Sequence, residues 1–151
     1  MKKVLLASKT SLYDFVHNNE DYNVITFMVQ EYPKNNNERT IAVANLFNKN
    51  GYRSGVEITV SGVSRSRRVP MVAIKGSDLY IGKVCSSDSK LEETILTLSD
   101  ISDDALCLLG DKINVTSLVI FNDIVISRLS DLARSCNVDI IKEKDLNGLF
   151  N

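Results

Sequence analysis

Hydrophobic and polar positions change their spacing along most of the chain in a way that predicts alternating helices and strands. Ile41, Ala44 and Phe47 recur at helical spacing and predict the first long helix. Residues 56–60 are rich in β-branched side chains and predict a strand. The polar and glycine-containing residues 61–68 predict a loop or the tip of a hairpin.

Residues 69–87 predict a β-hairpin. Two short apolar-rich runs flank a Gly-Ser-Asp turn at 76–78. Ser89 and Glu92 then stand at the spacing of a capping box, which predicts the start of a helix. Residues 102–109 predict a further turn or helix that ends at a glycine.

The last third of the chain predicts a strand–helix–strand unit. The continuous apolar run 117–121 is typical of a strand that is buried on both faces. The Asn-Asp pair at 122–123 predicts the cap of the next helix, and residues 138–141 predict a strand. Residues 145–150 predict a short terminal helix.

The fold class that follows is α/β (α+β), with one domain over residues 1–151. Residues 1–36 contain an extra N-terminal pair of strands at 2–8 and 23–31, and a core over 37–151 has the order αβββαβαβ. Because a helix joins the last two strands, they form a parallel pair with a right-handed crossover. We therefore expect a mixed sheet flanked by helices.

Composition excludes several classes of function. No apolar run approaches the roughly 20 residues of a membrane span, so we expect no membrane contact. The three cysteines form no CxxC pair and the chain has one histidine, so we expect no metal site, no cofactor and a reducing cytoplasmic setting. Residues 49–90 carry eight basic and three acidic side chains, whereas 91–151 carry five basic and eleven acidic ones.

The element order and the hairpin at its centre resemble the PD-(D/E)xK nuclease superfamily, in particular its Mrr-like restriction-endonuclease branch. The resemblance covers residues 38–150, and the stretches 70–87 and 118–150 carry it. It implies a restriction-endonuclease-like core. In that family two carboxylates hold a divalent cation, and a lysine positions or activates the attacking water.

This chain departs from the family at the positions that hold the metal. The resemblance places Met71 and Lys83 where the acids stand and Cys85 where the lysine stands. None of these three side chains offers a Mg²⁺ ion an oxygen ligand, and Lys83 repels it. We therefore expect a degenerate, non-catalytic site.

Carboxylates at other positions in the chain would still allow an enzymatic function. Glu57, Asp78 and Glu92, with Lys83 or Lys90, form one conceivable set. Solvated carboxylates in a strand, a turn and a helix start are the alternative interpretation, and we favour it.

The arginine-rich loop is the best candidate contact surface. Arg65, Arg67 and Arg68 lie within four residues among serines, and guanidinium and hydroxyl groups both donate to phosphate oxygens. Its further predicted contacts in the same basic segment are Lys49, Arg53 and Lys75. A solvated loop without a ligand is the alternative.

Three functional hypotheses follow. The first is a non-catalytic protein of nuclease fold that binds DNA or RNA through residues 49–90, or that is a subunit of a nucleic-acid-handling assembly. The second is a structural or adaptor subunit without a nucleic-acid role, a homo-oligomer or the partner of another protein, because its basic and acidic segments are complementary. The third is a small Rossmann-like ligand-sensing domain.

Overall fold

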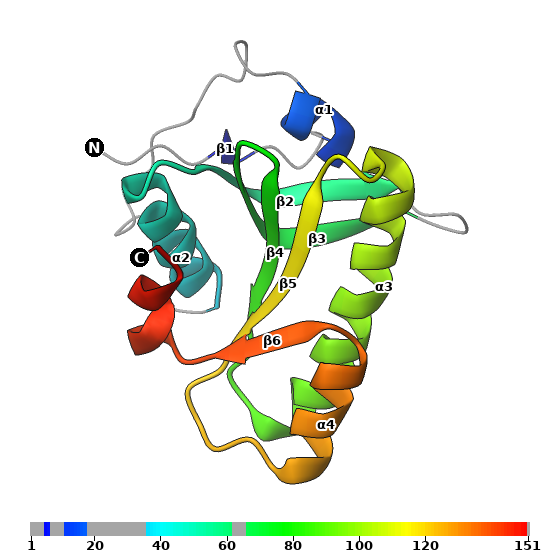
Figure 1. Ribbon diagram of the computed structural model, residues 1–151. Coiled ribbons are helices and arrows are strands. Elements are labelled where there is room, and N and C mark those ends of the chain that lie inside the picture. The colour runs from blue at the N-terminus through cyan, green and yellow to red at the C-terminus, as the bar shows by residue number, and fades with distance from the viewer. Residues whose placement is uncertain (1–4, 7–10, 18–35, 62–65, 151) are drawn as a thin grey trace.

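The computed structural model describes residues 5–6, 11–17, 36–61 and 66–150. One mixed sheet has helices packed on both of its faces (Figure 1). Its strands, in sheet order, are β1 (Leu5–Leu6), β2 (Arg53–Ser61), β3 (Ser66–Lys75), β4 (Asp78–Val84), β5 (Asn114–Ile120) and β6 (Val138–Ile141). The helices are α1 (Leu12–His17), α2 (Asn36–Lys49), α3 (Leu91–Leu109) and α4 (Ser127–Ser135), with 3₁₀ segments η2 (Asp88–Lys90) and η3 (Glu143–Phe150).

The strand pairing confirms the predicted α/β class and mixed sheet. Strands β2, β3 and β4 form an antiparallel meander, and β4, β5 and β6 are parallel. Helices α3 and α4 make the two crossovers, and α2 and η3 cover the opposite face (Figure 1). β1, parallel to β2, is the described part of the first predicted N-terminal strand, and the second, at 23–31, lies outside the described residues.

Each face of the sheet has its own hydrophobic core. The larger core lies on the α3 face and includes Ile81, Val119 and, from α3, Ile95 and Leu98. The smaller core lies on the α2 face. Its buried members are Ile41, Val43, Ala44, Phe47, Val56, Met71, Ala73, Val84, Leu118, Ile120 and Leu146.

The β2–β3 hairpin changes faces at Glu57. Val56 packs in the core of the α2 face, yet Ile58, two residues later, packs in the core of the α3 face. Side chains two apart in a regular strand share a face, but Glu57 has a φ of 55°, in the left-handed region, and this rotates the strand. Met71 and Val69 on β3 divide in the same way.

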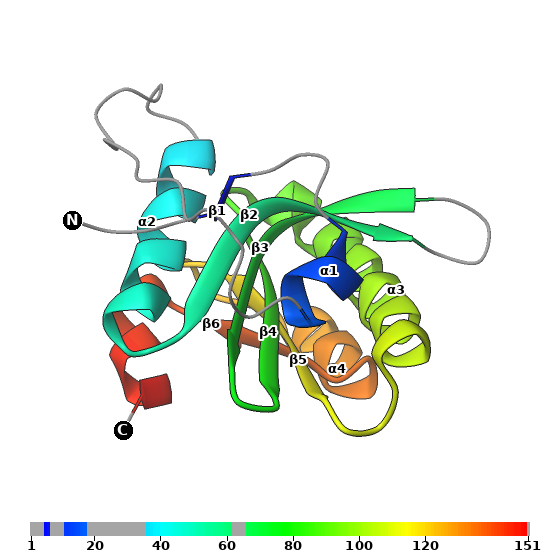
Figure 2. The same ribbon diagram turned by 90° about the horizontal axis from the view of Figure 1, so that it is seen from above.

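Both strands of the hairpin coil together at this point. The register is continuous, since Val56 lies opposite Met71 and Ile58 lies opposite Val69, so no extra residue is inserted. Figure 2 shows the outer ends of β2 and β3 directed toward α3. One hairpin therefore supplies side chains to both cores.

The structure corrects the prediction for the region after the hairpin. α3 is one helix of 19 residues, and the segment predicted separately at 102–109 is its second half. Ile101, Ala105 and Leu109 continue its buried stripe and so hold the helix together. The predicted capping box does not form, because η2 precedes the helix and no side chain caps it.

Two further expectations differ in the structure. The Asn-Asp pair at 122–123 does not cap α4, which begins at Ser127. Asn122 instead accepts a hydrogen bond from the backbone N–H of Glu143, at the start of η3. Of the segment predicted at 61–68 as a loop or hairpin tip, Ser61 belongs to β2 and residues 66–68 belong to β3, while residues 62–65 lie outside the described residues.

The left-handed conformation at Glu57 predicts that a glycine variant at this position is more stable than a valine variant, which is unusual for a strand. Glu57→Gly relieves a steric cost of about 1–2 kcal/mol but adds unfolded-chain entropy, so we expect it to be neutral or stabilising by up to about 1 kcal/mol. Glu57→Val is expected to destabilise by about 1–2 kcal/mol, despite the preference of valine for strands. Urea unfolding of both variants measures this, and a valine variant as stable as the glycine variant would contradict the proposed strain.

Candidate functional site

The interior of the β3–β4 hairpin is filled with apolar atoms on the α2 face. Met71 is directly opposite Gly82 in the strand register, and Met71 is 1% exposed. A Cβ atom added to Gly82 would lie 2.8 Å from Met71 Cε, so the methionine occupies the space that a side chain would need. Val84, on the same face, is also buried. The centre of this face therefore has no room for a ligand.

Lys83 and Cys85 lie on the other face. Lys83 is in register with Val119 of the α3-face core, and Cys85 belongs to that core. The structure therefore does not bring Met71 together with Lys83 and Cys85. Their assignment to one site was wrong because it counted chain positions without the cross-strand register.

On β4, the positions next to Lys83 and Cys85 that share the face of Met71 are Gly82 and Val84, while Tyr80 lies further along the same face. Only Gly82 and Val84 could replace Lys83 and Cys85 at the predicted site. Neither carries a side-chain oxygen or nitrogen, so the register removes metal ligands more completely than the sequence suggested. Across the described residues, no group of three or more His, Cys, Asp or Glu side chains is placed to hold a metal ion.

The conceivable set of migrated acids is not assembled either. Asp78, at the start of β4, accepts a hydrogen bond from Asn114, while Glu92 pairs with Arg128 beyond the other end of that strand. A strand of seven residues spans about 20 Å, so Asp78 and Glu92 do not share a site.

Two of the predicted phosphate-binding residues are used within the fold. Arg67, on β3, forms ion pairs with Asp100 and Asp104 on α3, and its side chain is 18% exposed. The guanidinium of Arg53 donates hydrogen bonds to the carbonyl oxygens of Phe15 and Val16, at the end of α1. Both arginines therefore stabilise the fold, which the sequence did not predict.

The other predicted basic residues do not form one patch. Lys49, Arg68 and Lys75 are exposed, and Arg65 lies outside the described residues. Arg68 and Lys75 are seven residues apart on β3, which corresponds to about 23 Å. The basic segment is therefore divided between two ends of the hairpin.

One of these ends carries an aromatic cluster that the sequence analysis missed. Phe47, Tyr52, Tyr80 and Phe150 form five ring pairs with centroids 5.0–5.9 Å apart, and the Nζ atom of Lys75 lies 5.6 Å from the ring of Tyr52. Burial raises the pKa of Tyr80, and the charges of Tyr52, Asp78 and Asp139 act in the same direction. Both tyrosines are partly exposed. The four aromatic residues are far apart in the sequence, so no local sequence pattern indicated this cluster.

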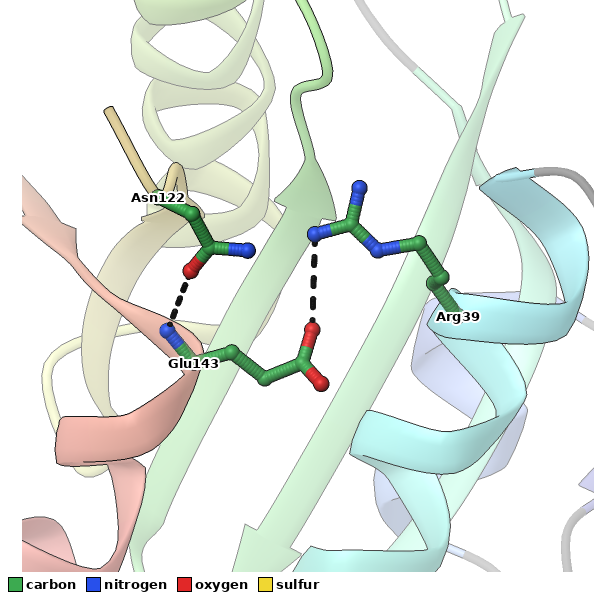
Figure 3. Close-up of polar contacts among 3 residues, drawn as sticks. All are labelled: Arg39, Asn122 and Glu143. Carbon is green, nitrogen blue, oxygen red and sulfur yellow. Dashed lines mark hydrogen bonds and ion pairs between the residues drawn. The ribbon is translucent and has the colours of Figure 1, made fainter.

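The carboxyl ends of the parallel strands form a second polar region. Glu143 accepts a hydrogen bond from Arg39 at 3.4 Å, and its backbone N–H donates to Asn122 Oδ1 at 2.8 Å (Figure 3). Asn122, Lys142, Glu143 and Lys144 line a hollow at this edge, where open α/β sheets commonly bind ligands. The Arg39 and Asn122 contacts join α2, the β5–α4 loop and η3, so their first role is structural.

An exposed apolar loop adjoins this region. Ile124 is 84% exposed and Ile126 is 56% exposed, in the segment that joins β5 to α4. Ile124 lines a hollow together with Ile140 and Ile141 of β6. Among the described helices, none has the length and apolar character needed to cross a membrane.

Comparison with known proteins supports the fold and nothing finer. No protein-family model and no curated protein matches the sequence. Among solved structures, the chain is similar to one described as "Crystal Structure of Protein of Unknown Function AF1548", with a TM-score of 0.55 and 12% sequence identity. The match covers 70% of this chain and 57% of the other. The match thus spans little more than half of that structure. At this sequence identity the likeness shows a shared fold alone.

The ion pairs of Arg67 predict a stability effect rather than a binding effect. Arg67→Ala leaves Asp104, itself 17% exposed, without its partner, so we expect a loss of about 2–3 kcal/mol in the free energy of unfolding. Arg68→Ala, the exposed neighbour, is the matched control and is expected to change stability by less than about 0.5 kcal/mol. Urea unfolding compares the two, and equal small effects would contradict a structural role for Arg67.

Proposed function

We propose that this protein is a non-catalytic binding module of nuclease-like fold that acts as a subunit in nucleic-acid handling. One observation carries the absence of catalysis: the face of β3 and β4 around Met71 is filled, with Gly82 and Val84 in place of polar groups. Without oxygen ligands there, hydrolysis by a metal-bound water has no site. The three cysteines are free, which supports the cytoplasmic setting as part of the same proposal.

The aromatic end of the α2 face supports the nucleic-acid part of the proposal. Partly exposed tyrosine rings next to ammonium groups provide stacking surface and phosphate contacts, which is the combination that binds single strands. The Nζ atom of Lys75 lies 5.6 Å from the ring of Tyr52, which in turn contacts Tyr80, and Lys49 precedes the Gly51 turn at the end of α2. We therefore propose that Lys49 and Lys75 are phosphate contacts and that the outer arginines are secondary.

Exposed apolar side chains favour the second candidate, a protein adaptor. Ile124 and Ile126 are large, two residues apart in the chain and exposed, as is common where a protein partner binds. An adaptor role does not require nucleic acid, and the two candidates give different results in the binding experiment below.

The first test is of catalysis. We expect no cleavage of single- or double-stranded DNA or RNA by the purified protein with Mg²⁺ or Mn²⁺, measured on labelled substrates. Glu57→Ala is the control, because Glu57 is the conceivable acid nearest Met71 along the β2–β3 ladder. Metal-dependent cleavage by the wild type that this variant loses would refute a non-catalytic protein.

The second test is of nucleic-acid binding. We expect Lys49→Ala/Lys75→Ala to weaken binding of labelled single-stranded oligonucleotides and to lower the slope of log K against log salt by about 1.4, from about 0.7 per lost contact. Lys142→Ala/Lys144→Ala removes the same charge at the other end of the sheet and serves as the matched control. Fluorescence anisotropy at several salt concentrations measures both.

The outcome separates the two candidate functions. Equal effects of the two double variants would indicate general charge attraction rather than a site. A wild-type protein that binds none of the oligonucleotides would leave the adaptor as the better candidate.

A further inference from the structure

The open edge of the sheet at β6 is the feature that no function described above uses. β6 pairs with β5 on one side, and among the described residues no strand pairs with its other side. An unpaired edge presents backbone N–H and C=O groups to any strand that approaches it.

The register shows which backbone groups face outward. Phe121 N–H donates to the carbonyl oxygen of Ile141, and Ile141 lies opposite Ile120 of β5. In a parallel pair the residues that bond to the neighbour alternate, so Asp139 and Ile141 bond to β5 while Ile140 faces away from it. Val138 and Lys142, two residues on either side, have the same orientation as Ile140.

The surroundings of this edge are largely apolar. A groove beside β6 is lined by Ala133 from α4, Leu149 from η3, and Ile140. The adjoining hollow contains Ile124, which is 84% exposed. An apolar strip therefore continues from the strand edge to the β5–α4 loop.

We propose that two copies of this chain associate through β6, with the two strands antiparallel about a two-fold axis at Ile140. In this arrangement Ile140 pairs with Ile140 of the second copy, and Val138 pairs with Lys142. Every outward-facing backbone group of one edge then meets its complement on the other, and Ile124 is covered at the same interface.

The charges around the edge favour a second copy over a charged partner. Three acidic and three basic side chains line the two hollows beside β6: Asp123, Asp139, Asp145, Arg134, Lys142 and Lys144. A rim with equal numbers of both signs has little net repulsion against its own copy. An acidic or a basic partner peptide would gain no general attraction from it.

Ile140→Pro is the sharpest variant. Proline lacks the N–H that would bond across the interface, and edge strands accept proline where that N–H faces outward, so the monomer is expected to fold. Ile124→Lys removes the apolar cover without touching the backbone. Leu96→Lys, at a 44% exposed leucine on α3, is the matched control that should not affect association.

Sedimentation velocity over a wide concentration range measures the association of the full chain. We expect a wild-type mass of twice 16.8 kDa, at least tenfold weaker association for Ile140→Pro and Ile124→Lys, and no change for Leu96→Lys. Hydrogen exchange of the wild type is an independent measurement: the Ile140 amide should become protected as the protein concentration rises.

Several results would overturn the proposal. A wild type that is monomeric throughout, a dimer that both edge variants leave intact, or an Ile140 amide whose exchange does not depend on concentration would each exclude it. A monomer that instead binds an unrelated extended peptide at β6 would also exclude it. None of these results decides the nucleic-acid proposal, which is tested separately by the Lys49→Ala/Lys75→Ala variant.

Discussion

The left-handed conformation of Glu57 is the constraint on which the arrangement of the β2–β3 hairpin depends. It rotates the hairpin between Val56 and Ile58, so the inner half packs under α2 and the outer half packs under α3. Arg67 lies two residues from Val69 on the outer half and therefore reaches Asp100 and Asp104 of α3. The rotation keeps Met71 in the core of the α2 face. In the same hairpin it turns Arg67, a predicted phosphate-binding residue, toward α3 and away from solvent.

The accessible surface of the sheet lies at its edges, because its centre is filled with apolar side chains. In a hydrolytic site of the kind that the sequence suggested, β3 and β4 would present carboxylates to a metal ion, but here they present Met71, Gly82 and Val84 to a core. What stays accessible is an aromatic and basic end, a polar carboxyl end and an apolar strand edge. The binding roles proposed above use these accessible surfaces and not the filled centre of the sheet.

Local sequence signals predicted the elements well where one interaction dominates. The hairpin turn before Asp78, the buried strand β5 and the helix end at Gly110, whose φ is 80°, all agree with the structure. The predictions that failed concern features that tertiary contacts determine. Nothing near Glu57 indicates a positive φ, and Asn122 satisfies the backbone of Glu143 rather than the adjacent helix. The aromatic cluster joins residues as distant as Phe47 and Phe150, so no local pattern could indicate it.

The order of the strands has a consequence for how the chain folds. From β2 to β6 the order across the sheet is the order along the sequence, so each strand joins a template formed by the one before it. Such a chain closes short loops first and does not wait for distant segments to meet, which lowers the entropic barrier to folding. We therefore expect the hairpin of β3 and β4, with its two-residue turn, to form early and β6 to dock last in the series.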